Sequence, residues 1–175
     1  TLRGQYGFNL DHANYGDKDK WFFLGRGRLQ RFPLLYYGIG PNTSPDAPAT
    51  VDALNIQIRE RVLRKIRPNF FGGLQVDWQN LSRVRFEQPS DAPPYPIPIG
   101  GNGSSNIGLG AGLVYDNRQN VLNVRNGFFA ELAYLNYNRL WGSTFNFSSV
   151  NLDARLFRTV RPNQVLAWQA FGLFQ

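Results

Sequence analysis

The sequence predicts an all-β protein, an antiparallel up-and-down transmembrane β-barrel. Three observations favour this fold. Apolar and polar residues alternate in long runs, the breaks between the runs are rich in Pro, Gly, Asn and Asp, and ionisable residues inside the runs take the parity opposite to the apolar ones. Alternation gives each strand one apolar and one polar face. A barrel that turns its apolar face to lipid and its polar face to a hydrated lumen accommodates both.

Composition excludes several other classes. With 42% hydrophobic and 15% aromatic residues, the 175-residue chain is not mainly disordered. Its mean hydropathy of -0.36 does not argue against a membrane barrel, because a barrel strand is only half apolar. The longest apolar stretch, residues 32–39, is far shorter than the roughly 18 to 20 residues of a membrane-spanning helix.

The sequence contains few of the residue types that catalysis and metal binding commonly use. There is no Cys and only one His, His12, which follows Asp11 in a region that we expect to be a solvated polar turn with no Ser nearby. A hydrolytic triad needs its nucleophile, base and acid together. We therefore predict no enzymatic activity, no catalytic residue, no metal site and no cofactor.

The alternation divides into eight runs that we expect to be strands. They cover about residues 2–10, 20–31, 53–67, 70–86, 107–115, 128–138, 144–158 and 165–174, with long loops between the second and third and between the fourth and fifth. The third run also matches a helical spacing of apolar residues, but its strict alternation over 53–59 and its β-branched content favour a strand. The fourth run is long for a strand of a soluble domain.

Tracing these strands up and down gives the sheet two different ends. The breaks near residues 16, 67, 119 and 162 fall at one end, and the longer loops near 45, 94 and 141 fall at the other. Outer-membrane barrels have short periplasmic turns and long outer loops in this way. Aromatic residues at the ends of runs resemble an interfacial girdle and include Trp21, Phe70, Tyr115 and Phe128 near the short-turn rim. A soluble sandwich with aromatic strand ends is the alternative.

Charged residues inside the runs predict a polar lumen. Those expected to face it are Arg26, Arg28, Arg59, Arg61, Asp77, Arg83, Arg85, Glu131, Asp153 and Arg155. A dry sandwich core cannot hold so many charges, whereas a hydrated barrel interior or one wet face of a soluble sheet can. The formal net charge of +7 then belongs mostly to the lumen, and we expect no nucleic-acid partner.

Two stretches resemble a known family. The first is 36–42, with Tyr37, Gly38 and Gly40, and the second is 108–132. In the second, a strand ends in Tyr115-Asp116-Asn117-Arg118 and another restarts at Gly127. This arrangement resembles the barrel of the BamA/TamA family of bacterial surface antigens. Asp116 can cap the turn, Arg118 can face lipid phosphates or Asp116, and Gly127 can supply a permissive backbone.

The resemblance implies an outer-membrane location in a Gram-negative bacterium. It also implies a role in inserting or translocating proteins, with outer-membrane lipid, client outer-membrane proteins and accessory assembly subunits as partners. Residues 1–175 would then be an internal segment of a barrel of about sixteen strands, without POTRA or other soluble domains. The family's lumen-entering Val/Leu-Arg-Gly-Phe/Tyr loop is absent. A complete eight-stranded barrel is the competing geometry, and a passive porin-like channel or the barrel anchor of a fused enzyme are the competing functions.

Overall fold

The computed structural model describes residues 4–40, 48–88, 96–120 and 122–175, which form an all-β fold. The strands are β1 (Tyr6–Gly16), β2 (Trp21–Arg31), β3 (Leu34–Tyr36), β4 (Ala49–Arg67), β5 (Phe70–Glu87), β6 (Ser104–Asp116), β7 (Gly127–Tyr137), β8 (Phe147–Arg161) and β9 (Gln164–Phe174). A short 3₁₀ turn, η1 (Arg139–Trp141), lies between β7 and β8. In the described part of the chain, no helix is long and apolar enough to span a membrane.

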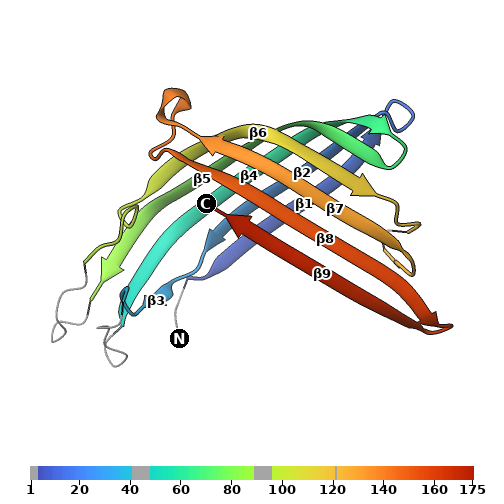
Figure 1. Cartoon of the computed structure of the whole chain (residues 1–175). Coiled ribbons are helices and arrows are strands. Elements are labelled where there is room, and N and C mark those ends of the chain that lie inside the picture. Colours follow the sequence, from blue (N-terminus) through green and yellow to red (C-terminus); the bar gives the residue numbers. More distant parts are fainter. Residues whose placement is uncertain (1–3, 41–47, 89–95, 121) are drawn as a thin grey trace.

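All strands belong to one antiparallel sheet in the order β1-β2-β4-β5-β6-β7-β8-β9, with β3 paired to the start of β4. Each strand on this path is thus hydrogen-bonded to its neighbours in the chain, as expected for an up-and-down arrangement. The sheet is curled like half of a barrel (Figure 1). At its two edges, β1 and β9 each pair with a single strand among the described residues.

The eight predicted runs correspond in order to the eight strands of the path, but several boundaries differ. The predicted first run is 2–10, of which residues 2 and 3 lie outside the described residues. β1 is Tyr6–Gly16, so it continues through the polar segment that we interpreted as a turn. The reason is its partner: β1 pairs with β2 over its full length, from Tyr6 opposite Arg31 to Gly16 opposite Trp21. His12 therefore lies inside a strand, and the solvated-turn prediction for it is wrong.

Differences at the other end of the sheet have a similar cause. β3 lies within the predicted long loop, where it pairs with β4, which itself begins at Ala49 instead of residue 53. β8 begins at Phe147 instead of 144 because the preceding residues bind β6. The Thr144 amide donates to the Ser105 carbonyl at 2.7 Å. Each of these pairings joins segments that the local pattern does not connect.

The connections divide between the two ends of the sheet as expected. β1, β4, β6 and β8 end at one end of the sheet, on the right in Figure 1, and β2, β5 and β7 end at the other. We call these the short-turn end and the long-loop end. The first end carries the tighter turns on the whole.

The two faces of the curl differ in character. Arg61 of β4 and Glu131 of β7 meet at 2.8 Å although β5 and β6 lie between their strands, so both side chains are on the concave face. The register then assigns every other residue to a face. On the convex face, large apolar side chains are exposed in the middle of the strands, among them Ile58, Val62, Leu74, Val76, Leu109, Leu113, Leu132, Leu152 and Leu156.

A small apolar core lies on the concave face toward the short-turn end. It consists of Phe22, Leu63, Phe71 and Val114, with the Tyr15 ring stacked on Phe22 at a centroid distance of 4.4 Å. Leu63 shares the parity of the charged residues of its strand, which alone would assign it to a polar face. The concave face is therefore apolar near the short turns and polar farther along.

Replacing a buried leucine of this core tests the assignment of the faces. We expect Leu63→Ala to lower the free energy of unfolding by about 2–5 kcal/mol, because it leaves a cavity at a fully buried position. The control is Leu74→Ala, since Leu74 is 73% exposed and lies opposite the adjacent residue Val62. It should cost about 1 kcal/mol or less. Urea unfolding followed by tryptophan fluorescence measures both, and equal losses would contradict the assignment.

Candidate functional site

A row of glycines on β6 opens the middle of the concave face. Gly108, Gly110 and Gly112 share the parity that faces the inside of the curl. A Cβ at Gly110 would lie only 1.8 Å from the Tyr134 carbonyl oxygen of β7, and one at Gly108 would lie 2.6 Å from the Tyr137 ring. With no side chains on β6 here, side chains of β4 and β5 reach across it to β7.

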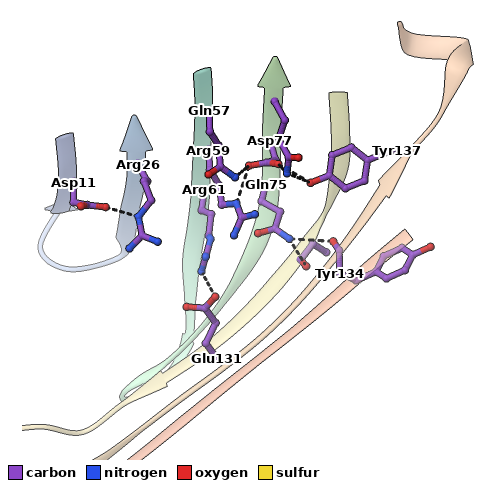
Figure 2. Close-up of polar contacts among 12 residues, drawn as sticks. Asp11, Arg26, Gln57, Arg59, Arg61, Gln75, Asp77, Glu131, Tyr134 and Tyr137 are labelled. Atoms are coloured by element: carbon purple, nitrogen blue, oxygen red, sulfur yellow. Dashed lines mark hydrogen bonds and ion pairs between the residues drawn. The ribbon is translucent and has the colours of Figure 1, made fainter. Parts of the chain in front are cut away.

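The centre of this polar network is Asp77 of β5, whose side chain is fully buried. Its carboxylate accepts hydrogen bonds from Arg59 Nε at 2.9 Å, Gln57 Nε2 at 3.2 Å, Gln79 Nε2 at 2.6 Å and the Tyr137 hydroxyl at 2.6 Å (Figure 2). These donors come from β4, β5 and β7. A polar group can be buried when hydrogen-bond donors surround it, and here the four donors make Asp77 a structural link between three strands.

Two further contacts extend the network toward the short turns. Arg61 donates to Glu131 across β5 and β6, and both side chains are only about a tenth exposed. Gln75 donates to the Tyr134 carbonyl oxygen at 3.1 Å over Gly110 (Figure 2). The Gln75 side-chain oxygen is buried without a hydrogen-bond partner in the described structure. The result is a concave wall held together across four neighbouring strands.

Other charges that we expected in the lumen also lie on the concave face. Arg26 binds Asp11 of β1 at 2.5 Å, and Asp153 binds Arg155 at 2.5 Å and accepts from Gln169. Arg28 shares their face and forms no ion pair within the part of the chain that the structure describes. Most of these arginines are thus paired with a carboxylate on their own or a nearby strand.

Arg83 and Arg85 are exceptions, and their predicted position is wrong. The register between β4 and β5 shifts between Asp52 and Leu54, where a bulge on β5 adds a residue. Arg85 therefore lies opposite Asp52 on the convex face, and Arg83 lines a pocket there. Simple alternation cannot foresee this because one extra residue reverses the parity of all that follow.

The convex face also carries a polar pair that the sequence did not indicate. His12 Nε2 of β1 and Glu60 of β4 approach to 3.1 Å across Gly25 of the intervening β2. A Cβ at Gly25 would occupy the space that both side chains use. Asn14 donates to the other ring nitrogen of His12 at 3.1 Å. A residue pattern confined to one strand gives no sign of such a pair.

The turn that resembles the family pattern has a defined geometry. Asp116 accepts hydrogen bonds from the Arg118 amide at 3.1 Å and from Arg118 Nε at 2.8 Å, and the Arg118 guanidinium lies 4.7 Å from the Phe129 ring centroid. Hydrogen bonding to Asp116 raises the pKa of Arg118, which therefore stays charged. Of the two partners considered for Arg118, the structure places Asp116 beside it.

The remaining family-pattern residues occupy separate places. Tyr115 is the penultimate residue of β6, directly before Asp116. Gly127 begins β7 with a φ of 133°, where a Cβ would lie 2.8 Å from Arg118 Cα. Tyr37, Gly38 and Gly40 follow β3 at the long-loop end, whereas Asp116, Arg118 and Gly127 lie at the short-turn end. Residues 41 and 42 of the first stretch lie outside the described residues.

No group of three or more His, Asp or Glu residues in the described ranges is arranged to bind a metal ion. No protein-family model matches the chain, and no curated protein or solved structure matches it significantly.

The glycine row allows a sharp test of the polar network. Gly110→Ala places a methyl group against the Tyr134 carbonyl, so the backbone of β6 or β7 must shift and the Gln75 hydrogen bond is lost. We expect a loss of about 1–3 kcal/mol in the free energy of unfolding. Gly112→Ala is the control because its nearest neighbour would be 3.7 Å away, and it should be neutral or stabilising. Urea unfolding compares the two, and equal stability of the variants would contradict this geometry.

Proposed function

We propose that this chain forms part of the wall of a transmembrane β-barrel in the outer membrane of a Gram-negative bacterium. The observation that carries the proposal is the segregation of the two faces. Exposed Leu, Ile and Val side chains cover the middle of the convex face, while the concave face holds the ion-paired network around Asp77. A soluble sheet that exposed this convex face would leave a large apolar surface in water. In a membrane barrel, lipid would contact the apolar convex face and water would contact the polar concave face.

Aromatic side chains at the short-turn end support a membrane interface there. Trp21, Phe70, Tyr115 and Phe128 share the convex face, and the rings of Tyr115 and Phe128 lie 6.2 Å apart. Aromatic side chains of this kind prefer the level of lipid head groups. The apolar band would then begin just beyond them, toward the middle of the strands.

We further propose that additional strands complete a barrel of about sixteen. The described strands curl through half a barrel, and neither edge is paired with the other. β9 is apolar on both faces: Phe171, on the concave face, is 63% exposed, and Trp168, on the convex face, is 57% exposed. An edge strand with these properties needs a covering neighbour.

The role that we propose for the complete barrel is insertion or translocation of proteins, by resemblance to the BamA/TamA family. The support is the Tyr115-Asp116-Asn117-Arg118 turn with Gly127, whose residues contact one another directly. A porin-like, anion-selective channel needs unpaired cations along its lumen. The pairing of Arg26, Arg59, Arg61 and Arg155 with carboxylates favours the first role.

Two adjacent substitutions in β4 test the orientation of the sheet in a membrane. Ile58 lies on the convex face and Gln57 on the concave face, where it donates to Asp77. We expect Ile58→Arg to cost about 2–4 kcal/mol when the full-length protein folds into lipid vesicles, because it places a charge in hydrocarbon. Gln57→Arg should cost about 1 kcal/mol or less, since an arginine can also donate to Asp77. If Gln57→Arg were the more harmful change, the proposed orientation would be wrong.

Reconstitution of the full-length protein separates the two functional roles. In vesicles, it should accelerate the folding of an added outer-membrane barrel client, and in planar bilayers it should conduct poorly or erratically. Steady, anion-selective conductance without acceleration of client folding would instead establish a porin-like channel. A protein that stays monomeric and folded in buffer without detergent would refute the membrane proposal itself.

A further inference from the structure

The convex face carries an unusual pocket at the long-loop end of the sheet. It is lined by Tyr6, Arg31, Asp52, Leu54, Arg83 and Arg85. These residues come from β1, β2, β4 and β5, within a few residues of where each strand starts or ends. Three of the six are arginines, whereas the next convex side chains toward the middle of β1, β2 and β4 are Phe8, Leu29 and Ile56.

The backbone is specially arranged to present these arginines. The β5 bulge places Arg85 opposite Asp52, on the same face as Leu54 and Arg31. Arg83 occupies the bulge with a φ of 54°, a left-handed conformation that is uncommon for residues other than Gly, Asn and Asp. Such a conformation costs free energy and persists only where its surroundings hold it. Without the bulge, both arginines would follow the parity of the concave face.

The charges of the pocket are not balanced. Arg31 binds Asp52 in a bidentate pair, with Nε to Oδ1 at 3.0 Å and NH2 to Oδ2 at 2.5 Å. Asp52 is the one carboxylate among the lining residues, so Arg83 and Arg85 leave two positive charges in excess. Neither has a hydrogen-bond or ion-pair partner among the described residues. The pocket therefore contains the guanidinium groups of Arg83 and Arg85 and the phenol of Tyr6, beside an Asp52 carboxylate that is already paired with Arg31.

We propose that this pocket binds the phosphate group of a membrane lipid whose acyl chains lie along the convex apolar face. The inference rests on the proposed function. Guanidinium groups bind phosphate oxygens through paired hydrogen bonds. On β5 the neighbouring convex residues Ser82 and Asn80 are polar, but on β1 and β4 the next convex side chains are apolar: Phe8 follows Tyr6, and Ile56 and Ile58 follow Leu54. A lipid phosphate at the rim thus places its chains over these residues, and the long-loop end assigns that lipid to the outer leaflet.

The test titrates full-length protein in detergent micelles with three probes: diphosphorylated lipid A, lipid A from which both phosphates are removed, and inorganic phosphate. Native mass spectrometry counts the bound molecules. We expect saturable binding of the phosphorylated lipid, at least about tenfold weaker binding once its phosphates are removed, and no comparable binding of inorganic phosphate. This comparison uses the unaltered protein and needs no variant to fold.

Variants locate the site. Arg83→Asn combined with Arg85→Gln removes both free charges, and asparagine tolerates the left-handed backbone of position 83. This variant should bind the phosphorylated lipid at least about tenfold more weakly, because it loses two charge-assisted contacts. The matched control is Arg158→Gln with Arg161→Gln, which removes the same charge from exposed positions at the short-turn end and should leave lipid binding unchanged.

Each other result overturns the inference. Equal affinity for the two lipid A forms would mean that the phosphates are not recognised, and tight binding of inorganic phosphate alone would mean a site for a soluble anion. An equal loss in the control variant would mean nonspecific charge attraction. If the protein requires detergent to stay folded but fails these tests, the lipid-binding pocket is refuted and the membrane proposal is not. If the protein is folded and monomeric without detergent, the membrane proposal itself is refuted.

Discussion

The burial of the Asp77 carboxylate constrains the rest of the sheet. A buried charge is tolerated only when its hydrogen-bonding capacity is satisfied, and here the donors come from β4, β5 and β7 at once. Those three strands must therefore keep their register and approach one another over β6. Tyr137 reaches Asp77 because Gly108 leaves its ring room. The curl of the sheet, the glycine row and the polar network are parts of one arrangement.

The same arrangement divides charge between the two faces. On the concave face, arginines meet carboxylates on their own or nearby strands, so the wall carries little unbalanced charge near Asp77, Glu131 and Asp153. On the convex face, the excess cations Arg83 and Arg85 gather at the long-loop rim. Internal pairing suits a wall that must hold its shape in water. Unpaired cations at a rim suit contact with an anionic surface.

The convex face also contains a polar contact between strands that are not neighbours, which joins His12 to Glu60 over Gly25. The hydrogen bonds that join Asn14, His12 and Glu60 reduce the cost of keeping these groups beside apolar side chains. Like the Asp77 network, this contact skips a strand at a glycine. Close approach at a glycine is thus used on both faces of the sheet to join strands that are not direct neighbours.

The sequence by itself determined the all-β class, the order of the eight main strands, and the division between short and long connections. Period-2 alternation and turn residues are local, so a single strand reveals them. Only the tertiary structure decided the remainder. β1 extends through His12 because β2 pairs with it, Leu63 is buried because three other strands bring apolar side chains to it, and Arg85 faces outward because a bulge resets the register. These outcomes depend on contacts between residues far apart in the chain, which alternation along one strand does not encode.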